Sequence, residues 1–175
     1  YLELLKNKKV LKIDFRSELQ KIKDELKDVQ VFIHNFKANR IFKMGLAFED
    51  GVKINSKIIY ISVAGYSESS VLAGKGAHDL NILALSGYLD NQTKLGEVVP
   101  LPSLLLADTY CSYSIVTRLM ATMLKGETGI HLQISMLEAM QEAMLVGKYF
   151  DPQSFPMSGK FPCYSIYKCK DGLVA

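Results

Sequence analysis

Short apolar runs alternate with amphipathic stretches along this chain. The apolar runs, rich in β-branched residues, predict strands at 8–14, 29–35, 57–66 and 130–135. The amphipathic and apolar stretches of helical length predict helices at 17–28, 38–45, 48–55, 79–88, 108–125 and 135–150. Parallel βαβ units have this order of elements, so the pattern predicts an α/β fold in which helices flank a parallel sheet.

The loops direct attention to particular segments. In parallel sheets ligands bind beyond the carboxyl ends of the strands, which here are followed by residues 14–16, 35–37 and 65–70. Two further loops are predicted, at 90–103 and at 151–162. The later one precedes a predicted strand at 163–172 that enters a turn.

Composition narrows the class of protein. Of the 175 residues, 49% are hydrophobic and 22% are charged, which is ordinary for a globular chain. The net charge is only +3, and no lysine-arginine block is dense enough to predict a nucleic-acid partner. No apolar run approaches the roughly 18 residues of a membrane span, so no membrane partner is expected.

The cysteines indicate a compartment. Cys111, Cys163 and Cys169 are odd in number and form no CxxC pair. This favours reduced thiols in an intracellular protein over a disulfide framework or a zinc site, and no metal is expected. The chain begins at Tyr1 rather than at a methionine, and it ends in what looks like an unfinished strand, so we expect both ends to be cut.

The dipeptide His78-Asp79 precedes an apolar run and is the clearest candidate for chemistry. A carboxylate near a helix N-terminus is stabilised by the helix dipole, so capping alone explains Asp79. A positive imidazolium is disfavoured at that position, and a neutral imidazole is a competent general base. The pattern leaves both capping and catalysis open for His78.

Asp108 presents the same ambiguity. It follows the apolar run at 101–107 and begins a predicted helix, where it could be the N-cap. It could instead be partly desolvated and exchange a proton.

Other polar positions have simpler interpretations. The glycines of "AGKGAH" at 73–78 lack the spacing and the Ser or Thr of a phosphate-binding loop, so a turn is favoured. A cationic cluster follows the second strand and is either a solvated helix face or a phosphate-binding patch; it consists of Lys37, Arg40 and Lys43. Residues expected to pack in the core are His34, His131, Met136, Met140 and Met144.

Several segments together resemble a known family. They are "NFKANRIFKMGL", "INSKIIYISVAGY", "HDLNILALSGYL", "PLPSLLLAD", "LMATMLKGETG", "ISMLEAM" and "PCYSIYKCKDG". In this order they resemble the alpha-methylacyl-CoA racemase branch of the family III CoA-transferase (CaiB/BaiF-like) superfamily, over essentially the whole chain.

The resemblance implies a longer, bilobed α/β protein that forms an interlocked homodimer. Residues 1–150 would be its large, Rossmann-like, CoA-binding domain without the first strand. Residues 151–175 would be the linker and the start of the small domain.

The resemblance also implies an activity, the epimerisation of 2-methylacyl-CoA thioesters by 1,1-proton transfer at the alpha carbon. His78 and Asp108, which are 108 − 78 = 30 residues apart, match the family's two proton-transfer residues. Backbone N–H groups at the start of the 79–88 helix would stabilise the enolate oxygen. No separate cofactor is implied, because coenzyme A is part of the substrate. The positions matching CoA contacts are Arg16, Asn35, Phe36, Lys37, Lys43, Ala77, Asp79, Leu80, Asn81 and Ile82.

Two alternatives remain open. In a CoA-transferase of this family Asp108 would be a nucleophile that forms an anhydride and then an enzyme-CoA thioester. A catalytically inactive relative is the other alternative, because bulky Tyr110 and Tyr113 follow the aspartate where the family has small residues. Ala38-Asn39 also replaces the family's Pro-Gly, and Lys43 stands where arginine is common.

Overall fold

A computed structural model describes residues 3–92, 101–145, 161–163 and 165–174 of the chain. The chain divides into two compact units, one of residues 1–62 with 121–132 and the other of residues 63–120 with 133–175. The domain boundary expected at 150/151 lies outside the described residues, so that division stays a prediction.

A parallel sheet confirms the predicted fold class. Strands β1 (Val31–His34), β2 (Ile59–Ala64) and β3 (Ile130–Ser135) lie in the order β1-β2-β3. β1 and β2 are parallel, and their register pairs Val31 with Ile59 and His34 with Ser62. Three of the four predicted main strands therefore form, and β3 has the predicted bounds.

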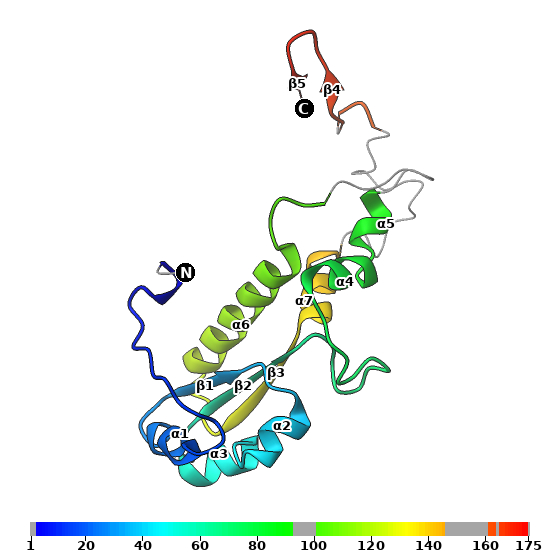
Figure 1. Cartoon of the computed structure of the whole chain (residues 1–175). Coiled ribbons are helices and arrows are strands. Elements are labelled where there is room, and N and C mark those ends of the chain that lie inside the picture. Colours follow the sequence, from blue (N-terminus) through cyan, green and yellow to red (C-terminus); the bar gives the residue numbers. More distant parts are fainter. Residues whose placement is uncertain (1–2, 93–100, 146–160, 164, 175) are drawn as a thin grey trace. The chain divides into compact units, whose positions relative to one another are not determined.

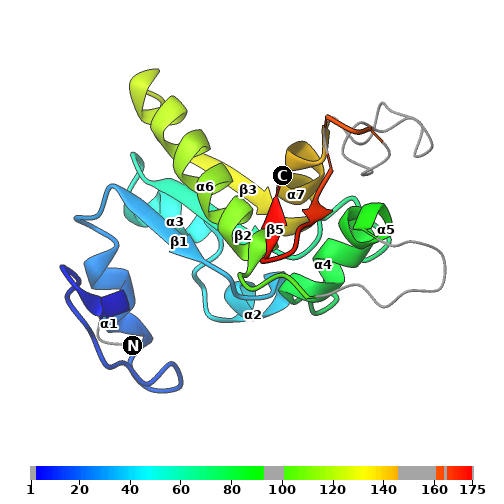
Figure 2. The same ribbon diagram turned by 90° about the horizontal axis from the view of Figure 1, so that it is seen from above.

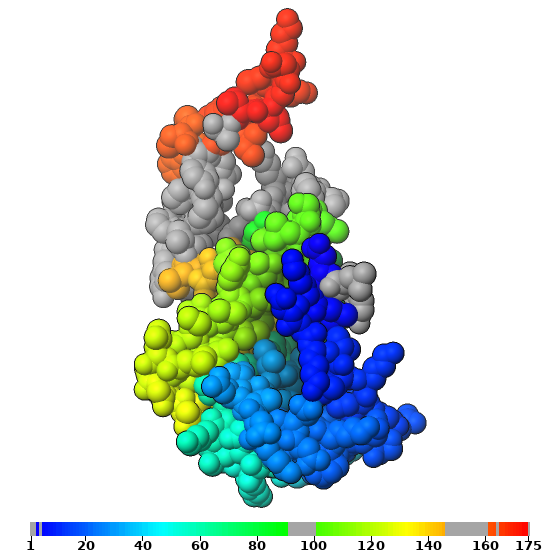
Figure 3. Space-filling model, turned by 90° about the vertical axis from the view of Figure 1, so that its left-hand side faces the viewer, coloured from blue at the N-terminus to red at the C-terminus, as the bar shows by residue number. Residues whose placement is uncertain are grey.

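The strand predicted at 8–14 is wrong. These residues have no strand structure, and Val10 and Leu11 are 56% and 47% exposed. The chain instead turns at Asp14, whose carboxylate accepts the Arg16 backbone N–H at 2.9 Å and the Ser17 hydroxyl at 2.8 Å. Figure 3 shows this N-terminal segment, in dark blue, at the surface. A β-branched run forms a strand only where a neighbouring strand can pair with it.

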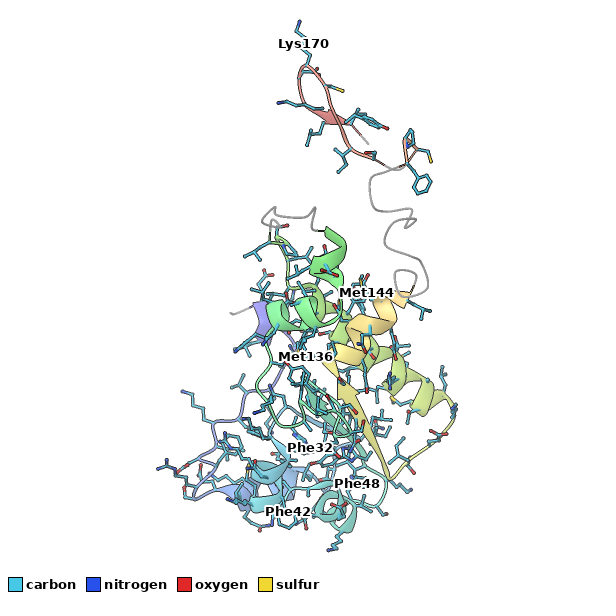
Figure 4. All side chains as sticks on the ribbon, turned by 90° about the vertical axis from the view of Figure 1, so that its right-hand side faces the viewer. Phe32, Phe42, Phe48, Met136, Met144 and Lys170 are labelled. Carbon is cyan, nitrogen blue, oxygen red and sulfur yellow. The ribbon has the colours of Figure 1, made fainter. Side chains whose placement is uncertain are left out.

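In the first unit, helices pack on the strands. After the short 3₁₀-helix η1 (Glu3–Leu5) come α1 (Leu19–Glu25), α2 (Ala38–Lys43) and α3 (Phe48–Ile54). Figures 1 and 2 show α2 and α3 covering one face of β1 and β2. The buried cluster beneath them consists of Leu26, Ile41, Met44, Leu46 and Ile58. Phe42 of α2, labelled in Figure 4, is 74% exposed and takes no part in this core.

The two histidines of this unit are packed among aromatic rings, as expected. His34 is 8% exposed, and its Nδ1 accepts the backbone N–H of Phe36 at 3.1 Å. Its Nε2 is buried and has no hydrogen-bond partner among the described residues. Burial, followed by the nearby His131, lowers the pKa of His34 from 6.5 to about 4. His131 lies 2.8 Å from the Ser62 hydroxyl through Nε2, and its ring stacks on Phe48.

The second unit holds helices α4 (Asp79–Leu85), α5 (Tyr88–Gln92) and α7 (Met136–Ala143), and most of α6 (Leu106–Leu124). Its buried cluster consists of Tyr66, Ile82, Leu83, Ala107 and Met140. Met136 and Met144, labelled on α7 in Figure 4, pack against this cluster, so the three methionines are core residues as expected. Short α5 was not predicted, and it takes up the start of the loop expected at 90–103.

The sequence also predicted how α7 begins. Ser135 is its N-cap, and the Ser135 hydroxyl oxygen accepts the backbone N–H of Glu138 at 3.2 Å. The predicted continuation of this helix over 146–150 lies outside the described residues. Near the C-terminus β4 (Tyr167–Lys168) and β5 (Leu173–Val174) form an antiparallel pair, so the strand predicted at 163–172 forms at only two of its described residues.

Within the described residues no helix is long and apolar enough to cross a membrane. The same part of the chain contains no group of three or more His, Cys, Asp or Glu side chains that could hold a metal ion.

Candidate functional site

The segment that leads to His78 is anchored beside the end of β2. Gly65 is the first residue after this strand, and an added Cβ there would lie 2.1 Å from the Cβ of Ala77. The Gly65 carbonyl accepts the backbone N–H of Leu137 at 3.1 Å and the Ser135 hydroxyl at 3.4 Å. The turn after β2 therefore contacts both the start of α7 and the residue before His78.

His78 is the N-cap residue of α4. Its backbone is extended, with φ −135° and ψ 161°, and its N–H donates to Asn81 Oδ1 at 2.7 Å. Its side chain is exposed and makes no hydrogen bond to the first turn of α4 within the described residues. Backbone contacts thus hold the residue, while the imidazole is left accessible to a substrate.

The Asp79 carboxylate caps the N-terminus of α6, whereas the sequence predicted that it caps its own helix, α4. Although it is the first residue of α4, its Oδ1 accepts the backbone N–H groups of Ala107 at 2.7 Å and Asp108 at 3.2 Å. These N–H groups belong to the first turn of α6, where a helix leaves its donors without partners in the helix itself. The carboxylate next to His78 therefore binds the backbone of Asp108.

Asp108 is the third residue of α6, because the helix begins at Leu106. The N-cap interpretation of Asp108 is therefore wrong. Its side chain is exposed, so the alternative of partial desolvation is not supported either. The Ser112 hydroxyl donates to its carbonyl at 2.9 Å. One turn further on, burial together with the Asp108 carboxylate raises the pKa of the Cys111 thiol.

The two tyrosines that follow Asp108 are exposed. Tyr110 is 43% and Tyr113 is 67% exposed on α6. They are not core residues of the second unit, so their bulk is available to shape a surface near Asp108.

A second set of predicted site residues gathers around Phe36 in the first unit. The ring of Phe15, the residue before Arg16, meets the ring of Phe36 edge-on, with centroids 5.5 Å apart. The Arg40 guanidinium lies 5.0 Å from the centroid of the Phe36 ring. This cation–π arrangement orients Arg40 along α2.

Lysines frame the same helix. Lys37 is the N-cap residue of α2, Lys43 is its last residue, and both are exposed, as is Asn35. We call Arg16, Lys37, Arg40 and Lys43 the cationic patch. The positive charge of these exposed residues suits the phosphates of a nucleotide, since exposed cations attract them.

The remaining predicted CoA contacts lie around the start of α4. Leu80 and Asn81 are exposed, and Ala77 is half-buried. Ile82 is fully buried in the core of the second unit, so its side chain serves packing.

The predicted residues thus fall into two sets, each described within its own unit. In the second unit the structure brings Asp79, the neighbour of His78, to the backbone of Asp108, and in the first unit it brings Phe15, the neighbour of Arg16, to Phe36. The sequence did not predict the close approach of Gly65 to Ala77, nor the ring contact between Phe15 and Phe36. A glycine directly after a strand was a signal for the role of Gly65. Nothing in the local sequence indicated the contact of Phe15.

Known proteins resemble this chain over most of its length. Residues 1–175 match the model of CoA-transferase family III. A CaiB/BaiF CoA-transferase family protein of Caenorhabditis elegans is 27% identical over 95% of this chain and 53% of its own. Mouse alpha-methylacyl-CoA racemase is 29% identical over 81% of this chain and 40% of its own. Human succinyl-CoA:glutarate CoA-transferase is 25% identical over 99% of this chain and 42% of its own.

A solved structure resembles the fold. The CAIB/BAIF family protein from Brucella suis superposes with a TM-score of 0.75 at 20% identity, over 95% of this chain and 47% of its own. The chain thus spans about half the length, or less, of the relatives it matches.

Proposed function

Because the chain belongs to CoA-transferase family III, we propose that its protein epimerises 2-methylacyl-CoA thioesters by moving a proton at the carbon beside the thioester carbonyl. Relatives of similar identity are named as a racemase and as CoA-transferases, so membership alone gives the family and not the reaction. The choice rests on the site.

The observation that carries the proposal is the link between two exposed ionisable groups. His78 is the N-cap residue of α4 and directly precedes Asp79, whose carboxylate accepts the backbone N–H of Asp108 in α6 at 3.2 Å. Inverting a carbon centre needs a base on one face and an acid on the other. Two groups from separate helices suit this need better than two neighbours on one helix.

In the proposed reaction His78 removes the C2 proton of one epimer, and the electron pair moves toward the thioester oxygen to form an enolate. Asp108 then donates a proton to C2 from the opposite face. For the other epimer Asp108 is the base and His78 the acid. The enolate oxygen would be stabilised by free N–H groups of the first turn of α4, as expected from the sequence.

The cationic patch supplies the second part of the proposal. Arg16, Lys37 and Lys43 would bind the phosphates of coenzyme A, a part of the substrate that does not react. Binding energy of this kind positions the substrate without taking part in proton transfer. Lysine acts there as a point charge without the bidentate geometry of arginine.

A second candidate is a CoA-transferase in which Asp108 is the nucleophile. Its exposure and the succinyl-CoA:glutarate CoA-transferase relative favour this candidate. The histidine favours the epimerase, because the transferase step needs no base at position 78.

The homodimer and the intracellular location remain predictions. Light scattering of the complete protein tests the homodimer.

One experiment separates the two reactions. The complete protein is incubated in deuterated water with a single epimer of a 2-methylacyl-CoA, and separately with an acyl-CoA and a free carboxylic acid. The epimerase incorporates deuterium at C2 and produces both epimers. CoA transfer to the free acid without deuterium at C2 would reject the epimerase in favour of the transferase.

A further inference from the structure

The contact between Asp79 and the start of α6 joins segments that are distant in sequence. Asp79 Oδ1 accepts N–H groups from residues 28 and 29 positions later, at 2.7 Å from Ala107 and 3.2 Å from Asp108. One oxygen atom thus binds two consecutive backbone donors of another helix.

This contact replaces a cap that α6 cannot make for itself. The residue before the helix is Leu105, whose aliphatic side chain has no hydrogen-bond acceptor. Good N-cap residues provide an oxygen for the N–H of the second or third helical residue, and Ala107 and Asp108 occupy these two positions. Ala107 is fully buried, so water does not readily replace the Asp79 carboxylate there.

Asp79 itself is held in place by its neighbours at the start of α4. Asp79 follows His78, whose N–H is held by Asn81 at 2.7 Å. Ile82 and Leu83 of α4 are buried in one cluster with Ala107 of α6. The position of His78 relative to Asp108 is therefore set by packing between α4 and α6 and by one carboxylate between them.

We infer that Asp79 is a positioning residue that holds Asp108 in place relative to His78, rather than a group that contacts coenzyme A or transfers a proton. This inference rests on the proposed function, because it assigns Asp79 a part in the reaction of those two residues. An Asp108 nucleophile in a transferase would need the same support. Among the described residues, the Asp79 carboxylate acts through the backbone N–H groups of Ala107 and Asp108.

The test compares Asp79→Ala and Asp79→Asn in the complete protein. Alanine removes both acceptor contacts, whereas asparagine keeps a neutral oxygen that can accept them. Asp50→Ala is the matched control, because the Asp50 carboxylate accepts the backbone N–H of Ala47 at 3.2 Å at the start of α3 in the first unit. It removes a capping contact of the same kind without touching α6.

The first measurement is amide hydrogen exchange in the peptide that covers 104–110. Asp79→Ala should speed exchange of the Ala107 and Asp108 amides, Asp79→Asn should do so much less, and Asp50→Ala should leave these amides unchanged. Unaltered protection in Asp79→Ala would overturn the inference whatever the activity of the protein.

The second measurement is steady-state kinetics with the acyl-CoA substrate. A displaced Asp108 should lower kcat of Asp79→Ala by about 10- to 100-fold with little change in KM, since small misplacement of a catalytic group is costly. Asp79→Asn should recover most of kcat with an unchanged shape of the pH profile. A raised KM with normal kcat would make Asp79 a CoA contact, and loss of one limb of the pH profile in Asp79→Asn would make it a proton-transfer group; either overturns the inference.

The two measurements separate this inference from the function. If the parent protein neither epimerises nor transfers CoA, the proposed function is rejected, and with it the kinetic role of Asp79. Faster exchange in Asp79→Ala would then show the capping contact alone.

Discussion

Gly65 and Ala77 approach so closely that a side chain at position 65 would occupy the space of the Ala77 methyl group. An added Cβ at Gly65 would lie 2.1 Å from the Ala77 Cβ, a separation that carbon atoms do not tolerate. Because Ala77 precedes His78, this approach links the end of β2 to the N-cap of α4.

The first prediction follows from that separation. Gly65→Ala should lower the free energy of unfolding by about 1–3 kcal/mol, as overpacking does, and reduce activity by displacing His78. Gly76→Ala is the matched control, because its Cβ would meet no heavy atom within 4 Å in the described part of the chain. Urea unfolding measures both variants.

A compensating change tests the cause of the loss. Ala77→Gly should restore much of the stability lost in Gly65→Ala, because it removes the methyl group that clashes. In a double-mutant cycle the two changes should therefore be coupled. Additive losses would show that the two residues do not meet.

The second prediction concerns pH and His34. Burial holds the pKa of His34 near 4 in the folded protein, against 6.5 for an ordinary histidine. The unfolded chain therefore binds the proton first as pH falls. The contribution of neutral, buried His34 to the free energy of unfolding is fully present above pH 6.5. It is lost as pH falls from 6.5 to 4, by up to about 1.4 kcal/mol per pH unit.

Substitution of His34 by asparagine should flatten this dependence. The Asn side-chain oxygen can accept the Phe36 N–H in place of Nδ1 but does not titrate in this range. His34→Asn should be less stable than the parent at pH 7, yet lose less stability between pH 6.5 and 5. An equally steep slope in His34→Asn would contradict the assignment.

The third prediction tests the cationic patch. Lys37→Ala and Lys43→Ala should each raise KM for an acyl-CoA by about 2- to 5-fold, in line with exposed ion pairs of up to about 1 kcal/mol, while kcat changes little. The effect should shrink at high salt, which screens exposed charges. Lys53→Ala, at an exposed position of α3, is the control. Equal KM changes in all three variants would reject the patch as a specific site.

Much of the fold was predictable because its strands are strongly apolar. β1, β2 and β3 lie within or match the runs expected from β-branched residues, and α6 begins within two residues of its predicted start. The run at 8–14 was predicted to be a strand from Val10, Leu11 and Ile13, yet it forms none, because strand formation depends on a pairing partner that local sequence does not reveal.

The site was less predictable, for a related reason. The sequence placed Asp79 at a helix start and suggested a capping carboxylate, but it could not reveal that the capped helix begins 27 residues later, at Leu106 (106 − 79 = 27). The same contact corrected Asp108 from an N-cap to a residue inside the first turn. Tertiary contacts decide both points, whereas periodicity reports only local structure.

The most direct test of the account follows each epimer of a 2-methylacyl-CoA separately in deuterated water with Asp108→Asn and His78→Ala. With one acid–base group left, C2 can lose its proton and regain deuterium only on one face. Asp108→Asn should exchange one epimer with retained configuration, His78→Ala should exchange only the opposite epimer, and neither should interconvert them. Exchange of the same epimer in both variants, or normal epimerisation by His78→Ala, would contradict a two-base reaction at His78 and Asp108.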